Sequence, residues 1–293
     1  MFQLFKDCIA HPRNIANHVD KPNKKFIGFF IILILIYVFP AMLIVSTNNS
    51  LPSDSIEVMS QAFTTASDLH YEIKDGKLVS EDQNAYGTEF VKTNVVIQNN
   101  YFDLAYVFDM TGQNYHVEQT FDSQSYILVV FQEDHIKMFA GSKQISDESK
   151  LKVYEKTYEE LGIKNITFND CKGKSYYEFN IQFTGLVNSI FKSIKNKFLP
   201  LIIIGIILAY TLSYVILLLG ISLLELLFYH MAGIKFGKIF KIVTYASTPY
   251  LVLSFIGTLT GLSFLNFIGE LILIIYAMKA LSTYAILSHI NKL

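Results

Sequence analysis

Several short residue combinations could carry chemistry, and none completes a catalytic signature. Gly173-Lys174-Ser175 matches the end of a phosphate-binding loop, but Phe168 stands where that loop needs its first glycine. Ser189 and Lys192 have the residue types of a serine–lysine dyad, and we interpret them as the polar, headgroup-facing end of a membrane helix. We therefore expect no catalytic residue.

Metal and cofactor chemistry is not indicated either. His116, Glu118 and His135 could share a strand face, but no pair of histidines has helical ligand spacing. The segment 109–112 fits a turn after a strand, and its surroundings lack the further oxygen ligands of a calcium loop. We expect no metal site and no bound cofactor.

The most informative polar residues lie inside an apolar stretch. Glu270 falls six residues into the predicted span 264–285, and Asn266 precedes it by one turn on the same helix face. A carboxylate in a bilayer core costs a few kcal/mol, so it should face other helices, a wet cavity or the headgroup layer about 9 Å away. Two interpretations stay open: Glu270 reaches the outer interface, or Asn266 and Glu270 form an intramembrane polar site.

Other residues of the apolar stretches predict helix geometry. Gly257 and Gly261 form a small-xxx-small pair that would let another helix approach closely. Pro249 should kink the third span, with Ser247 and Thr248 able to satisfy the freed backbone groups. Glu225 is expected just past the second span, at the inner interface, where a charge costs little.

The elements that position these residues are membrane helices. The chain is 52% hydrophobic and only 17% charged, and its uncharged runs 27–45, 198–224 and 242–269 are each long enough to cross a bilayer core of about 20 helical residues. This composition excludes a soluble enzyme, a fibrous chain and a disordered tail. A net charge of -1 gives no reason to expect a nucleic-acid partner.

Basic residues orient the predicted spans. Five of them precede the first span and three lie between spans two and three, so both termini should be cytoplasmic. The fold class predicted is an integral membrane α-helical protein with four transmembrane helices and an extracytoplasmic α+β domain inserted between helices 1 and 2. The predicted parts are a cytoplasmic segment 1–25, transmembrane helix 1 at 26–46, the extracytoplasmic domain 47–197 and a three-helix transmembrane region 198–293, with spans near 200–220, 242–260 and 264–285.

Local patterns predict the elements of the inserted domain. Residues 54–69 have the apolar spacing of an amphipathic helix, and Asp75-Gly76 predicts a two-residue hairpin turn. A second helix is expected at 149–161 and a helix from 185 continuing into the second span. Residues 1–10 predict a short helix on the inner leaflet. Strands are expected at 71–73, 77–79, 91–98, 101–109, 126–132, 136–139 and 176–183.

Several short motifs resemble those of a known family. The chain is similar to Firmicute membrane proteins grouped under domain of unknown function 1189, some of which are named maltodextrin-utilisation protein MalA. That resemblance implies a multi-pass protein of a Gram-positive cell membrane and supplies no catalytic residue. The third-span region also resembles Yip1-type membrane proteins. The motifs that carry the first likeness are 2–12, 23–28, Pro40, 75–78, 107–112 and 238–249.

These patterns leave two leading hypotheses on function. In the first, the chain is a non-enzymatic accessory or sensor protein whose outer domain binds a partner, a cell-envelope component or a sugar. Its helices would dock onto another membrane protein, for which a carbohydrate transporter of the ABC class is the candidate. The second is a transport or mechanotransmission subunit, because one span, a large outer domain and three further spans are the layout of FtsX and MacB-type permeases. A membrane enzyme is a third hypothesis and would need paired polar residues at one depth, which Asn266 and Glu270 hint at.

Overall fold

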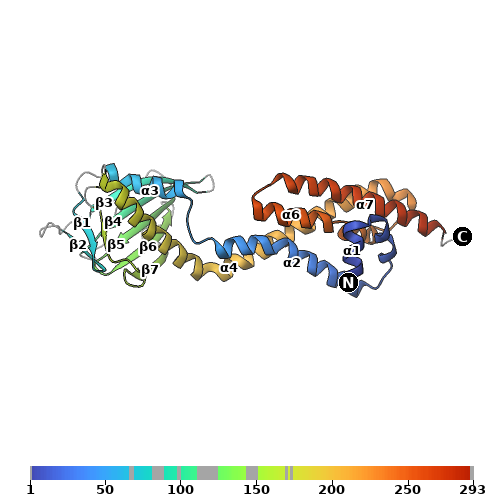
Figure 1. Cartoon of the computed structure of the whole chain (residues 1–293), viewed down its shortest axis with the longest axis horizontal. Coiled ribbons are helices and arrows are strands. Elements are labelled where there is room, and N and C mark those ends of the chain that lie inside the picture. The colour runs from blue at the N-terminus through green and yellow to red at the C-terminus, as the bar shows by residue number, and fades with distance from the viewer. Residues whose placement is uncertain are drawn as a thin grey trace. The chain divides into compact units, whose positions relative to one another are not determined.

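The computed structural model describes residues 2–65, 69–80, 89–97, 100–110, 125–142, 151–168, 171 and 174–290. They form two compact units, shown in Figure 1. The helix unit consists of Met1–Asn48 and Leu199–Leu293, and the sheet unit consists of Asn49–Phe198. The sequence-based boundaries of the inserted domain were 47 and 197.

Two β-sheets build the sheet unit. The larger has the order β3 (Glu89–Ile97), β4 (Asn100–Phe108), β5 (Ser125–Phe131), β6 (His135–Ser142), β7 (Leu151–Thr157), and only β4 and β5 pair in parallel within it. The smaller has the order β2 (Lys77–Ser80), β1 (Tyr71–Lys74), β8 (Ile166–Thr167). The predicted hairpin turn is confirmed, because Lys74 pairs with Lys77 and both Asp75 and Gly76 have positive φ.

An aromatic core joins the large sheet to two helices. Helix α3 (Ser53–Thr65) and the first part of α4 (Lys174–Tyr229) lie across one face of the sheet (Figure 1). The Phe63 ring lies 4.8 Å from Tyr106 of β4 and 5.2 Å from Phe179 of α4, measured between ring centroids. Such pairs add about 0.5–1.5 kcal/mol each beyond the area that they bury.

Two predicted elements of this unit are wrong. Residues 149–161 were expected to be helical, but Leu151–Thr157 is strand β7, where Tyr154 pairs with Met138 of β6. Residues 176–183 were expected to be a strand, but they belong to α4, because Phe179 and Phe183 are buried one helical turn apart. In both cases an aromatic pattern of few residues fitted two periodicities, and pairing or packing with distant elements decided between them.

Helices make up the rest of the molecule. The helix unit contains α1 (Phe2–Ala10), η1 (Pro12–His18), α2 (Asn23–Thr47), the end of α4, η4 (His230–Ala232), α5 (Phe236–Ala246), α6 (Thr248–Thr260) and α7 (Phe264–Ile290). Among the described residues three helices are long and apolar enough to cross a membrane, or four if α5 and α6, bent by 44°, count as one span.

The N-terminal helix differs from its expected place. Residues 2–10 are helical, but Leu4 and Cys8 are buried in the core of the helix unit instead of presenting a face to a lipid surface. The Tyr276 hydroxyl of α7 donates a hydrogen bond to the Ile9 carbonyl at 2.9 Å. The segment α1–η1 is therefore part of the packed helix unit.

Candidate functional site

The helix unit contains a cavity of about 360 Å³ at the predicted polar site. Asn266 lines it, and the Oδ1 atom of Asn266 is buried without a hydrogen-bond partner. Glu270 is half-buried one turn further along α7 and does not line the cavity. The structure therefore assigns the two candidate residues different surroundings. The residues that line the cavity are Tyr37, Ala209, Tyr210, Ser213, Ser254, Thr258 and Asn266.

Four tyrosines next to this cavity were not identified from the sequence. The Tyr37 ring lies 5.6 Å from Tyr210, 5.3 Å from Tyr214 and 6.1 Å from Tyr250. The Tyr250 hydroxyl donates to the Tyr37 hydroxyl at 3.4 Å, and the Tyr214 hydroxyl is 2.6 Å from Ser247 Oγ. The only signal in the sequence is a set of tyrosines inside apolar runs, whose buried hydroxyls need partners. The cavity lining is uncharged and rich in hydroxyl groups, which suits neutral hydrogen-bonding groups.

The predicted kink lies at the α5–α6 break. Pro249 is in the first turn of α6, where its missing N–H leaves no helical hydrogen bond unmade. The Ser247 and Thr248 hydroxyls donate to the carbonyls of Thr244 and Tyr245 at 2.7 and 2.9 Å. The break is thus stabilised by the side chains expected to do so.

The two predicted packing glycines have different roles. A Cβ at Gly257 would meet the Leu262 carbonyl oxygen at 3.0 Å, so this residue does allow a close approach. Gly261 instead ends α6 with φ of 73°, and a Cβ there would meet nothing within 4 Å, so the small-xxx-small interpretation is wrong for it. The closer contact between helices is at Gly269 of α7, where a Cβ would lie 2.9 Å from the Tyr250 ring.

Polar contacts also tie the N-terminal segment to the helices. Lys241 of α5 is 6% exposed, and its ammonium donates to the carbonyls of Val19 and Lys21 at 2.6 and 2.7 Å. Lys238 pairs with Asp20 at 2.9 Å and donates to the Tyr284 hydroxyl at 2.6 Å. These lysines were interpreted from sequence as loop charges, and the structure makes them anchors of the N-terminal segment.

A buried pair lies within the N-terminal segment. His18 Nε2 is 2.9 Å from Asp7 Oδ2, and the Lys21 ammonium is 2.6 Å from His18 Nδ1. Burial opposes ionisation of Asp7, but hydrogen bonds from His18 and Asn14 hold the pKa of its carboxyl below the usual value. The neighbouring Cys8 thiol has its pKa raised to about 12, mainly by burial.

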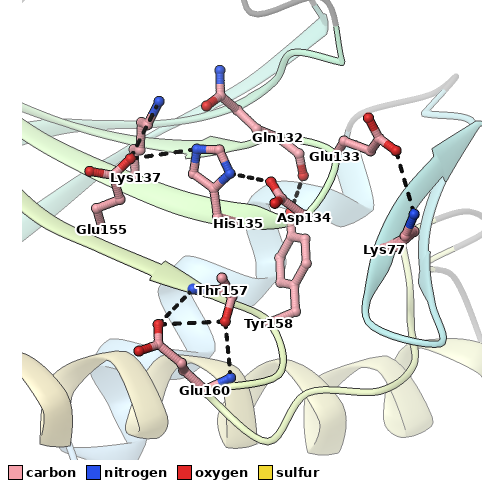
Figure 2. Close-up of polar contacts among 10 residues, drawn as sticks. All are labelled: Lys77, Gln132, Glu133, Asp134, His135, Lys137, Glu155, Thr157, Tyr158 and Glu160. Atoms are coloured by element: carbon pink, nitrogen blue, oxygen red, sulfur yellow. Dashed lines mark hydrogen bonds and ion pairs between the residues drawn. The ribbon is translucent and has the colours of Figure 1, made fainter.

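The sheet unit has an open cleft of about 540 Å³ that we call the loop cleft. It lies where the β1–β2 turn, the β5–β6 turn and the loop after β7 meet (Figure 2). Main-chain hydrogen bonds fix these loops together: the Gly76 N–H donates to the Lys164 carbonyl and the Leu78 N–H to the Glu133 carbonyl, at 3.0 and 2.7 Å. The loop cleft is lined by Asp75, Gly76, Lys77, Asp134, Thr157, Glu159, Gly162, Ile163 and Lys164.

Tyr158 supports the loop cleft from below. It is fully buried, its N–H donates to the Asp134 carbonyl at 3.2 Å, and its hydroxyl donates to the Gln132 carbonyl at 2.7 Å (Figure 2). Burial raises the pKa of the Tyr158 phenol, which therefore remains a hydrogen-bond donor at neutral pH. The β5–β6 turn is held rigid by this side chain.

Charged side chains surround the loop cleft on its exposed side. Lys77 lies 3.7 Å from Glu133, and Asp134 forms a short hydrogen bond with His135 (Figure 2). That bond lowers the pKa of the Asp134 carboxyl. Glu160 accepts from Lys156 at 3.0 Å and from the Thr157 N–H at 3.1 Å. Both signs of charge border the cleft, so it suits a polar ligand that donates and accepts hydrogen bonds.

The remaining sequence candidates are not assembled into a site. His135 contacts acids of the β5–β6 turn and β7, while His116 and Glu118 lie outside the described residues. Gly173 also lies outside them, and Phe168 is part of the aromatic core. No group of three His, Cys, Asp or Glu side chains placed to hold a metal ion occurs among the described residues.

The matched family has no assigned activity. The model of the family described as "Protein of unknown function (DUF1189)" matches residues 2–281. The chain belongs to this family. Comparison with curated proteins and with solved structures gave no significant match. The family match therefore covers both units and leaves the function to be argued from their geometry.

Proposed function

We propose that this DUF1189 protein is a multi-pass membrane accessory or sensor protein without enzymatic activity. In this proposal both termini are cytoplasmic, the sheet unit is extracytoplasmic, and the helix unit spans the bacterial cell membrane. Three or four helices of sufficient length and apolarity support the membrane assignment. The absence of a complete catalytic signature from the sequence supports the non-enzymatic one.

The loop cleft is the observation that carries the binding role. Loops joined by main-chain hydrogen bonds lose little conformational freedom when a ligand binds, which favours recognition. Asp75, Glu159 and Lys164 line the cleft and offer two acceptor groups and one donor group. A polar cell-envelope component or sugar is the ligand class that we propose, and the helix unit would pass the signal to another membrane protein.

Ligand binding can be tested with the full-length protein in detergent. Thermal unfolding is measured with soluble cell-wall fragments and with malto-oligosaccharides, since a ligand that binds only the native state raises the melting temperature. The matched variants are Asp75→Ala and Lys164→Ala in the cleft and Lys192→Ala, exposed on α4, as the control. A shift that the cleft variants remove and the control retains supports the proposal; no shift with either ligand class contradicts this ligand assignment.

Topology has its own test. Single cysteines replacing Ser142 and Lys235, in a background without Cys8 and Cys171, are treated with an impermeant maleimide on intact cells. The proposal expects labelling at position 142 alone. Labelling at 235 alone, or at both positions, would refute it.

The partner is proposed from the family resemblance. A MalA-like likeness suggests a carbohydrate transporter, and co-purification in mild detergent from the native host followed by mass spectrometry tests it. Enrichment of a transporter subunit over a control membrane protein is the expected result.

A second candidate function is a transport or mechanotransmission subunit. It is favoured by α4, one 56-residue helix that has residues in both units. An ATPase subunit as the main co-purifying protein would favour this alternative over the sensor.

A further inference from the structure

Glu225 is the most unusual ionisable group of the helix unit. Its residue is 1% exposed, and both carboxyl oxygens are buried without a hydrogen-bond partner. The sequence predicted a position at the inner interface, but α4 continues to Tyr229 and Glu225 lies on its packed face. Burying an unpaired carboxylate costs several kcal/mol, so this group needs a counter-charge, a ligand or a proton.

The packed face of α4 explains how the carboxyl is enclosed. Leu218, Ile221 and Ser222 are buried at helical spacing before Glu225, whereas Leu223 and Leu227 are exposed on the opposite side. One turn after Glu225, the Tyr229 hydroxyl contacts Ser282 Oγ of α7 at 2.7 Å and donates to the Met278 carbonyl at 3.1 Å. Glu225 is therefore held within the helix unit and does not point to its surface.

The charged groups at this end of the helix unit are engaged elsewhere. On α5, Lys241 donates to carbonyls of the N-terminal segment and Lys238 pairs with Asp20. On α7, Lys279 is exposed, and after α4 so is His230. In the N-terminal segment, Asp7, His18 and Lys21 bond to one another. None of these groups neutralises Glu225.

A metal ion is the wrong ligand for this place. Calcium requires six to eight oxygen ligands and magnesium about six. The nearest hydroxyl on the same face, Ser222, donates to the Leu218 carbonyl at 2.6 Å, and the described residues contain no group of three metal-binding side chains. A proton needs only one carboxyl oxygen. We infer that Glu225 is a proton-binding site inside the helix unit, at which exchange of a proton changes the packing of α4.

Labelling with dicyclohexylcarbodiimide tests this inference on the full-length protein in native membranes. The reagent is apolar and reacts with a protonated carboxyl: the acid proton moves to a carbodiimide nitrogen while the carboxyl oxygen bonds to the central carbon. Modified peptides are located by mass spectrometry at ~pH 5 to ~pH 9. Modification at Glu225 should be lost in Glu225→Gln and should fall about tenfold per pH unit once the carboxyl ionises. Glu270, half-buried in the same unit, is the matched carboxyl.

Thermal unfolding in detergent keeps the inference testable if the reagent cannot reach the site. A carboxyl that holds its proton better in the folded state loses stability as pH rises above its unfolded-state value of about 4.3, so the wild-type melting temperature should fall with pH. Glu225→Gln should remove that dependence and Glu270→Gln should keep it. Glu225-specific labelling or a Glu225-specific pH dependence supports the inference. Wild-type protein that shows neither, or labelling at Glu270 alone with melting curves shared by wild type and Glu225→Gln, overturns it.

Discussion

Lys241 should hold the N-terminal segment against the helices, and Lys241→Met tests this. Methionine keeps most of the apolar stem but removes the ammonium that donates to the Val19 and Lys21 carbonyls. Charge-assisted hydrogen bonds contribute about 1.5–3 kcal/mol each, and the release of a buried charge offsets part of that sum, which leaves a loss of about 3 kcal/mol. For a protein of this size the melting temperature should fall by about 6–12 °C.

Cys8 reports directly on the position of the segment. Its thiol is fully buried and its pKa is raised to about 12, so it should react very slowly with a maleimide while the segment is docked. In a Cys171→Ser background it is the only cysteine. If about 3 kcal/mol of docking free energy is lost, Lys241→Met should label on the order of 100-fold faster, because each 1.4 kcal/mol is a factor of ten.

The matched control is Lys238→Met. The Lys238 side chain is 45% exposed and its ion pair with Asp20 is screened by water, so its loss should cost less than about 1 kcal/mol. Equal labelling rates in wild type and Lys241→Met would refute the anchoring role of Lys241. Equal acceleration by both lysine variants would show that exposure of the pair, and therefore the magnitude reasoning, is wrong.

Three further predictions concern single residues. The lowered pKa of Asp7 means that its contribution to stability is present above the usual carboxyl pKa of about 3.9 and is lost as pH falls further, so Asp7→Asn should flatten the acid side of the melting curve; identical acid sides would contradict this. Glu270→Gln should leave the melting temperature and partner association unchanged, because Asn266 and not Glu270 lines the cavity; loss of co-purification at normal abundance would instead assign Glu270 to a site. Gly269→Ala should lower stability by about 1–3 kcal/mol, since the new Cβ would lie 2.9 Å from the Tyr250 ring, while Gly205→Ala, with open space around its Cβ, should be neutral; equal effects would refute the close contact of α6 and α7.

Local chemistry explains which parts of the fold the sequence predicts. The Asp75-Gly76 turn needs positive φ at two adjacent residues, and that requirement is met by residue type alone. The order of strands in the large sheet places β5 beside β4 in parallel, and no local signal specifies such a pairing. Residues 151–157 became a strand for the same reason, because pairing with β6 overrides a weak helical period.

The candidate site shows the same division. Asn266 could be found from the sequence because a polar side chain in an apolar run is conspicuous. The cluster around Tyr37 could not, since its rings come from α2, α4 and α6 and meet only in the folded helix unit. Glu225 was misplaced because a span of average length was drawn from Leu201, whereas α4 extends beyond it.

The buried polar atoms of the helix unit fall into two groups with different physical meaning. In an apolar solvent, helices gain little from burying apolar side chains, so hydrogen bonds such as Tyr214 to Ser247 specify which helices pack together. These pairs are satisfied within the chain and need no ligand. The Glu225 carboxyl and the Asn266 carbonyl have no partner in the chain, so packing alone leaves their desolvation cost unmet. A protein that keeps such groups in a membrane must offset that cost with something from outside the chain, which is why a proton at Glu225 and a neutral ligand at Asn266 follow from the same argument.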